Sequence, residues 1–284
     1  MNPASSSRYQ ALILNRWSRD PSLARLARLP GRIHRDTKAI LLLRNWREFL
    51  AAEVTGDSLK RLQFRNGLLL TAPVNASLAF LFDEIWIREV YNPPGYKLQV
   101  GDVVVDIGAN IGVYSTYAAT RASPIKVHAY EPFPDSIAWL RQNIADSRLT
   151  NIQPYQRAVA ASAGERTLVV DCSDWGLSSF YRNSDHKQRV SVKCTTLDIV
   201  LDEVGRCDLL KLDCEGSEYE ILQGCSPETL SRVKRIVGEY HEWPGIKGTG
   251  QELCRLLESC SFRIDRFESF GVGSGLFCAT NTTA

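Results

Sequence analysis

The stretch that decides the fold is "VVDIGANIGVYS" (residues 104–115), in which an apolar strand ends on an acid and turns through two spaced glycines into a helical segment. A dinucleotide-binding turn follows the pattern G-x-G-x-x-G, whose glycines let the helix start approach a pyrophosphate. Here Asn110 stands between Gly108 and Gly112, and the third glycine is missing. The pattern therefore favours a ligand that has no phosphate.

An amino-acid end that carries both charges suits this turn. Backbone N–H groups at Gly108 and at the helix start are placed to receive a carboxylate, and a nearby acid can take an ammonium. S-adenosylmethionine is a ligand of this kind. We expect the following residues to bind the cofactor here: Asp106, Gly108, Ala109, Asn110 and Gly112.

The next strand ends in "AYEPFPDS" and adds a second part of the cofactor site. Ligands of open α/β sheets lie at the carboxyl edge of the strands, where Glu131 can accept both hydroxyls of a ribose. NAD enzymes also carry an acid at this place, but together with the non-phosphate turn it favours S-adenosylmethionine. Phe133 either stacks on the adenine or is a core aromatic that starts a helix.

Two further strand ends carry ionisable residues, in "LLKLDCEGSEYEIL" and "IVGEYHEW". Charges are rarely buried without partners, so Asp213 and Glu215 are expected to face the cofactor and the acceptor. We expect His241 to act as general base, oriented by Glu239 or Asp213, because imidazole titrates near neutral pH. A hydrogen-bonded structural histidine is the alternative. We expect no metal, although these acids offer a site for a divalent cation, which chelation would test.

The alternation of strands and helices from residue 103 onward predicts an α/β fold with a mainly parallel sheet that is covered on both faces. Pro154 lies inside a strand and removes a ladder donor, so that strand is expected at a sheet edge. A strand pair at 166–171 and 189–194 interrupts the alternation. Its loop is a natural place for acceptor contacts, which we expect at Gly176, Ser178 and Ser179.

The N-terminal part has a different character. Residues 9–55 read as helical and are rich in arginine and lysine, which indicates either a basic face or a solvated amphipathic helix pair. Asn66-Gly67 predicts a tight hairpin, and paired prolines end a helix expected over 77–91. We divide the chain into a helical basic extension, 1–60, that serves as a lid or for docking or homodimer contacts, and a catalytic domain, 61–284.

Composition excludes several classes of protein. The 284 residues are 44% hydrophobic and 23% charged, with a formal net charge of +2. These values fit a globular domain and are too balanced to indicate nucleic-acid binding. No apolar run approaches the length of a membrane span, and no secretory signal is visible. The eight cysteines have no C-x-x-C pairing, which favours reduced thiols and a cytoplasmic location.

The motifs together resemble the FkbM family of S-adenosylmethionine-dependent methyltransferases, over about residues 64–243. The family's KxDxEGxE segment appears as Lys211, Asp213, Glu215, Gly216 and Glu218, and its final E-x-H as Glu239 and His241. The resemblance implies a Rossmann-like class I methyltransferase fold, with a seven-stranded, mostly parallel sheet and an antiparallel last strand. It also implies O-methylation, commonly of hydroxyls on natural products or sugars.

The resulting prediction is an O-methyltransferase acting on a hydroxyl of a small molecule. Methylation of a carboxylate on a peptide or another natural product is the alternative, because some relatives do this. A non-catalytic cofactor-binding module and an NAD-dependent reductase are alternatives of other classes. Residues 92–95, "NPPG", resemble a motif of adenine methylation in nucleic acids, but glycine replaces the aromatic residue, so a helix-terminating turn is the better interpretation.

Overall fold

A computed structural model describes residues 21–74, 76–171, 178–181, 187–246, 248–271 and 273–283. The first 20 residues of the expected basic extension and the expected acceptor residue Gly176 lie outside these ranges. Within the described ranges, no helix is long and apolar enough to cross a membrane.

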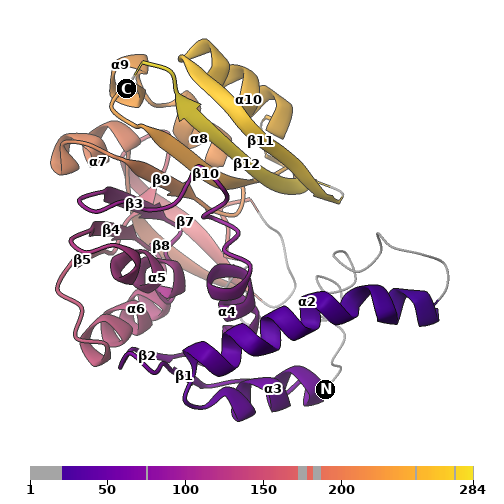
Figure 1. The fold of residues 1–284 in the computed structure, drawn as a ribbon. Helices are drawn as coiled ribbons and strands as arrows, with labels where there is room; N and C mark the ends of the chain where they lie inside the picture. Colours follow the sequence, from indigo (N-terminus) through magenta and orange to yellow (C-terminus); the bar gives the residue numbers. More distant parts are fainter. Residues whose placement is uncertain are drawn as a thin grey trace.

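The centre of the molecule is a seven-stranded sheet with the order β11-β12-β10-β9-β3-β4-β5 (Figure 1). Six of its strands run in the same direction, and the seventh, β12, runs antiparallel to its neighbours β10 and β11. Pro154 lies in β5 at the sheet edge, as expected from its missing N–H. The Rossmann-like class I fold is therefore confirmed. The bounds are β3 (Val103–Ile107), β4 (Lys126–Tyr130), β5 (Ile152–Tyr155), β9 (Leu209–Leu212), β10 (Arg235–His241), β11 (Phe262–Gly271) and β12 (Ser274–Asn281).

Successive residues of β3 pack into the hydrophobic clusters on opposite faces of this sheet, since successive side chains of a strand point in opposite directions. Val104 belongs to one hydrophobic cluster, with residues of α5 (Val113–Arg121) and α6 (Pro134–Asp146). Val105 belongs to the other, with residues of α7 (Leu197–Val204), α8 (Glu218–Gln223) and α10 (Gly250–Ser259). The sequence analysis missed α7 and the one-turn helix α9 (Pro227–Leu230).

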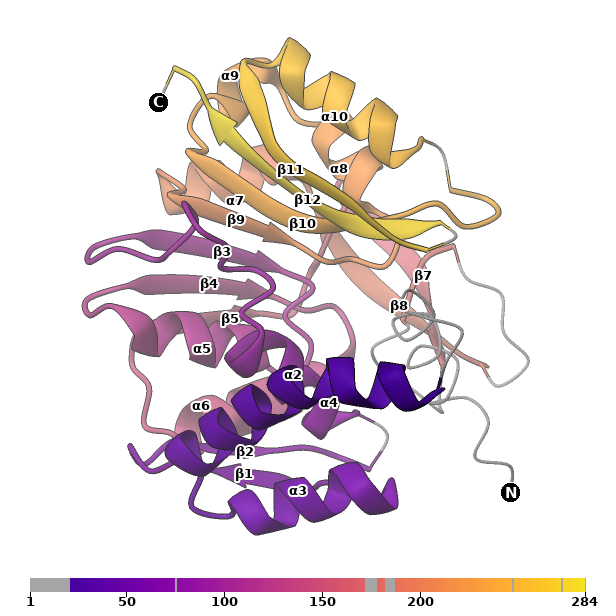
Figure 2. The ribbon, with the colours of Figure 1, turned by 45° about the vertical axis from the view of Figure 1, so that its right-hand side comes forward.

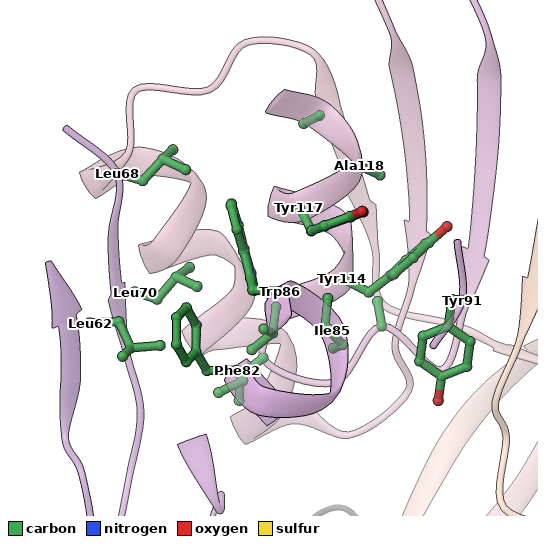
Figure 3. Packing of buried hydrophobic residues seen from close by; sticks show 14 of the residues in the cluster. Leu62, Leu68, Leu70, Phe82, Ile85, Trp86, Tyr91, Tyr114, Tyr117 and Ala118 are labelled. Atoms are coloured by element: carbon green, nitrogen blue, oxygen red, sulfur yellow. The ribbon is translucent and has the colours of Figure 1, made fainter. Parts of the chain in front are cut away.

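The N-terminal elements pack against the first of these faces (Figures 1 and 2). Trp86 lies edge-on to Tyr117 of α5, with ring centroids 5.2 Å apart, and Phe82 fills the space beside it (Figure 3). The hairpin around Asn66-Gly67 is present, but the helical segment expected over 77–91 ends at Ile87. The bounds are α2 (Pro21–Leu42), α3 (Trp46–Thr55), β1 (Arg61–Gln63), β2 (Leu69–Thr71), α4 (Leu78–Phe82) and the π-helical turn η1 (Asp83–Ile87).

The inserted strands form a second sheet with the order β6-β8-β7. Their bounds are β6 (Ala158–Val159), β7 (Gly164–Asp171) and β8 (Lys187–Thr195). The two long strands pair antiparallel along their whole length, as the sequence indicated. Because β6 follows the edge strand β5 almost directly, this sheet begins beside the carboxyl edge of the main sheet.

Candidate active site

The glycine turn after β3 brings two chain segments into close contact. Gly108 has φ 79°, and a Cβ added there would lie 1.8 Å from the carbonyl oxygen of Asp213. Gly112 has φ 87°, and its Cβ would lie 2.2 Å from Cδ1 of Leu140. Both values of φ lie in the left-handed region that favours glycine. The turn is therefore shaped by contact with the end of β9 and with α6.

The N–H groups of this turn are already bonded within the protein. Gly108 and Ala109 both donate to the carbonyl oxygen of Tyr130, at 3.1 and 3.0 Å, and Asn110 donates to Glu131 at 2.8 Å. The expectation that the N–H of Gly108 receives a ligand carboxylate is therefore wrong. The turn instead allows a ligand to come close to the protein backbone.

Asp106 lies beneath the turn and is fully buried. Its carboxylate accepts a 2.6 Å hydrogen bond from the hydroxyl of Ser115 and lies 3.2 Å from the ammonium of Lys211. Lys211 also donates to the carbonyl oxygen of Gly108 at 2.9 Å. Asp106 therefore holds the turn through Lys211, and its carboxylate is not exposed to the ammonium of a ligand as the sequence suggested.

Glu131 is the acid that reaches the ligand edge from β4. Its two carboxylate oxygens accept the N–H groups of Asn110 and Phe133, at 2.8 and 2.9 Å. Burial raises the pKa of Glu131 to about 7, and these two hydrogen bonds oppose the rise. The carboxyl group is thus oriented by backbone donors and titrates close to neutral pH.

An open cleft lies along this edge of the sheet. Six of the expected site residues line it: Gly108, Asn110, Glu131, Ser178, Asp213 and Glu215. The other expected residues that the structure describes are not among its lining residues: Asp106, Ala109, Gly112, Phe133, Ser179, Glu239 and His241.

Phe133 is only 2% exposed and packs in a small cluster with Leu168 and Ala158. A different aromatic residue, Phe180, lines the cleft. The guanidinium of Arg166 lies over the ring of Phe180, 4.1 Å from the ring centroid. Arg166 also forms an ion pair with Glu220 at 2.6 Å. Sequence analysis missed Phe180, because its neighbours on β7 and α8 are distant in the chain.

Ser179 attaches the segment that carries Phe180 to the rest of the protein. Its backbone exchanges two hydrogen bonds with Val169 of β7, at 3.0 and 2.9 Å. Its hydroxyl donates to the carbonyl oxygen of Glu215 at 2.5 Å. Glu215 itself has φ 53°, a left-handed backbone conformation that is uncommon for a residue with a side chain. The hydroxyl of Ser179 thus serves to hold the cleft wall together.

The opposite end of the site is a buried network of ionisable side chains. Asp213 lies 3.4 Å from the ammonium of Lys211, and its carboxylate contacts the hydroxyl of Tyr91 at 3.0 Å. The same hydroxyl contacts Glu239 at 2.9 Å. Burial, together with the charges of Asp213 and Glu84, raises the pKa of Glu239 to about 8. Neither Tyr91 nor Lys211 was among the residues expected at the site, although Lys211 belongs to the family's KxDxEGxE segment.

His241 lies at the far side of this network, with its side chain 1% exposed. Nδ1 lies 3.2 Å from Glu218, and Nε2 lies 3.6 Å from Glu239 and 3.9 Å from Glu215. Burial favours the neutral ring, but the charges of Glu218 and Glu215 outweigh it and raise the pKa of His241 to about 10. The histidine is thus an imidazolium at neutral pH.

Asp213, Glu239 and His241 each bring an atom within 4.8 Å of the other two, which is close enough to share a cation. Asp213 and Glu239 both contact Tyr91, His241 lies 3.6 Å from Glu239, and the neighbouring carboxylates raise the pKa of the histidine to about 10. We assign no metal to them, and the expectation of a metal-free site stays a prediction.

The glycine turn, the acid at the end of β4 and the acid pair after β9 lie together at the carboxyl edge of the sheet, where a ligand can bind. The methyltransferase FkbM domain matches the chain over residues 106–264, which is more than half of its length. The chain belongs to the FkbM methyltransferase family. It is therefore a methyltransferase that uses S-adenosyl-L-methionine.

Named relatives of this FkbM methyltransferase act on different molecules. It is 29% identical over 240 residues to the 31-O-demethyl-FK506 methyltransferase FkbM of Streptomyces tacrolimicus, covering 73% of this chain and 90% of that one. It is 27% identical over 179 residues to the hexuronic acid methyltransferase AglP of Haloferax volcanii, covering 61% of this chain and 70% of that one.

Among solved structures, the chain is similar to the magnesium protoporphyrin IX methyltransferase ChlM of Synechocystis, with bound S-adenosylmethionine. The identity is 12% and the TM-score is 0.43, over 72% of this chain and 82% of that one.

Proposed function

We propose that this FkbM methyltransferase transfers the methyl group of S-adenosylmethionine to a hydroxyl of a small molecule. The observation that carries the proposal is the placement of Asp213. Asp213 lines the cleft, its side chain is 27% exposed, and Lys211 and Tyr91 both contact one of its two carboxylate oxygens. A carboxylate in that position can accept a hydrogen bond from an acceptor hydroxyl and then take its proton.

The residues at the other end of the cleft fit the cofactor. Glu131 presents a carboxyl group, oriented by two backbone N–H groups, to which a ribose can donate. Gly108 and Asn110 line the cleft beside it and allow a ligand to approach the backbone closely. When bound, S-adenosylmethionine supplies a methyl group that is activated by a positively charged sulfur.

The proton of the acceptor hydroxyl goes to Asp213 in this proposal. The hydroxyl becomes strongly acidic as its oxygen bonds to the methyl carbon, so a carboxylate is a sufficient base. As an imidazolium, His241 has no vacant nitrogen for that proton. We therefore exchange the roles that the sequence suggested: Asp213 accepts the proton, while His241 holds Glu215 by charge and lies beside Glu239.

The electrostatics of this end of the site favour a neutral acceptor. Three carboxyl groups, those of Asp213, Glu215 and Glu239, surround the acceptor end, and a carboxylate substrate would be repelled by those that are ionised. Basic residues of the N-terminal extension could attract a carboxylate substrate, but two of them are already paired with acids. Arg35 pairs with Glu53 at 2.7 Å, and Lys38 pairs with Glu89 at 3.3 Å.

A panel of acceptors tests the proposal, namely glucose, glucuronic acid and 31-O-demethyl-FK506, each offered with labelled S-adenosylmethionine. Glucuronic acid carries both a hydroxyl and a carboxylate, so its product is decisive. A methyl ether survives mild base, whereas a methyl ester is cleaved. We expect base-stable products; a base-labile product from glucuronic acid would show that the enzyme methylates carboxylates.

A further inference from the structure

The segment just before the first strand of the parallel sheet reaches into the active site. The FkbM domain match begins at residue 106, so Tyr91 lies outside it. Tyr91 follows η1, whose residues Ile85, Trp86 and Ile87 are buried in the core below the sheet. Despite its place in the chain, Tyr91 is only 2% exposed and contacts two acids of the site.

The hydroxyl of Tyr91 lies between two carboxyl groups, 3.0 Å from Asp213 and 2.9 Å from Glu239. A phenol has one hydrogen to donate and can accept through its oxygen. Both contacts are therefore satisfied only when one carboxyl group accepts from Tyr91 and the other, carrying a proton, donates to it. Asp213 is the acceptor in this arrangement because it is ion-paired with Lys211.

The ring of Tyr91 is held firmly enough to direct this hydroxyl. Tyr114 of α5 meets it edge-on, with ring centroids 5.5 Å apart, and the two rings lie side by side in Figure 3. The ammonium of Lys211 lies 5.2 Å from the centroid of the Tyr91 ring. Lys211 thus contacts both the tyrosine ring and Asp213, which fixes their relative positions.

We propose that Tyr91 is a positioning residue for methyl transfer, whose hydroxyl holds Asp213 toward the cleft and ties it to Glu239. This inference rests on the proposed role of Asp213 as the group that accepts the hydroxyl proton. Loss of the phenol hydroxyl leaves Asp213 held by Lys211 alone and frees the carboxylate to rotate. A small misplacement of a reacting group is costly, because catalysis depends on its orientation.

The chain offers a matched control in Tyr114. It is also 2% exposed, and its ring also lies near Lys211, at 5.7 Å from the ammonium. Within the described residues, however, its hydroxyl has no hydrogen-bond partner. Tyr91→Phe and Tyr114→Phe therefore remove the same atom from equally buried rings, and only the first removal breaks contacts with the acids.

The experiment compares the two variants with the wild type. Melting temperature and the Kd for S-adenosylhomocysteine report on fold and cofactor binding, and turnover is measured with whichever panel acceptor is methylated. We expect Tyr91→Phe to lower kcat by about tenfold or more, with Kd changed less than about twofold. Tyr114→Phe should leave all three values unchanged. Equal losses of kcat in the two variants would overturn the proposal.

A second measurement needs no acceptor. In protein labelled with [4-¹³C]tyrosine, the hydroxyl-bearing carbon reports on hydrogen bonds to the phenol. We expect Asp213→Asn and Glu239→Gln each to shift the Tyr91 resonance and to leave the Tyr114 resonance unchanged. If neither substitution shifts the Tyr91 resonance, its hydroxyl does not connect Asp213 with Glu239. A base-labile product would overturn the hydroxyl acceptor, and with it the expected loss of kcat in Tyr91→Phe. The response of the Tyr91 resonance to the two acid substitutions would still test the contacts themselves.

Discussion

The two ends of the cleft are held in different ways. At the cofactor end, Glu131 is bonded to the backbone N–H groups of Asn110 and Phe133, both nearby on the same sheet edge. At the acceptor end, Asp213 is held by the side chains of Lys211 and Tyr91, and Tyr91 comes from before the sheet begins. Backbone bonding makes the first end rigid and local, whereas the second depends on side chains brought together by packing.

The largest effect is expected where the two ends touch, at Gly108. Gly108→Ala would place a Cβ 1.8 Å from the carbonyl oxygen of Asp213, a backbone atom that cannot yield cheaply. We expect no rise in melting temperature when S-adenosylhomocysteine is added to this variant. Gly112→Ala is the control, since its Cβ meets a movable methyl group of Leu140, and binding should be partly retained. Normal binding by Gly108→Ala would contradict the close contact.

Asp213→Asn separates the two ends functionally. The amide cannot take a proton from an acceptor, so we expect kcat to fall by about 100-fold or more. The Kd for S-adenosylhomocysteine should change by less than about threefold, because the ribose site at Glu131 is untouched. Isothermal titration and initial rates check both values. A rise in Kd that matches the loss of turnover would move Asp213 to the cofactor end.

The cofactor end should respond to pH near neutrality. The pKa of Glu131 is raised to about 7, so its carboxylate forms as pH rises from 6 to 8. Since the folded value exceeds the unfolded one, this group lowers the stability of the free protein as pH rises toward 7. Ribose hydroxyls donate to the ionised form, so affinity for S-adenosylhomocysteine should rise by up to about tenfold. Glu131→Gln should flatten this profile; an unchanged slope would exclude Glu131 as its source.

The aromatic residues of the cofactor end give the smallest expected effect. Phe180 lines the cleft and Phe133 does not, so we expect Phe180→Leu to weaken S-adenosylhomocysteine binding by about three- to tenfold. Phe180→Tyr should retain affinity, because the ring remains. Phe133→Leu should lower the melting temperature with little effect on affinity. The reverse pattern would restore Phe133 as the stacking residue.

Local pattern predicted the cofactor end better than the acceptor end. The strands β3, β4, β5 and β9 are short runs within the alternation of strands and helices that the sequence predicted from residue 103 onward. Parallel strands bring their carboxyl ends to one edge, so the placement of Glu131 and Asp213 beside a single cleft could be inferred. The contact partners of Asp213 could not be inferred. Tyr91 carries no signal in the sequence, and the motif that contains Lys211 does not say which groups its ammonium contacts.

By itself, the sequence determined the sheet and the family and predicted the sheet edge where we propose that the cofactor binds, because these follow from periodicity and from glycine and acid positions within short segments. Tertiary structure decided which groups are available for chemistry. The N–H of Gly108 is taken by Tyr130, and His241 is charged because Glu218 and Glu215 surround it. Hydrogen-bond occupancy and charge depend on distant neighbours, and only folding brings those neighbours within a few ångströms.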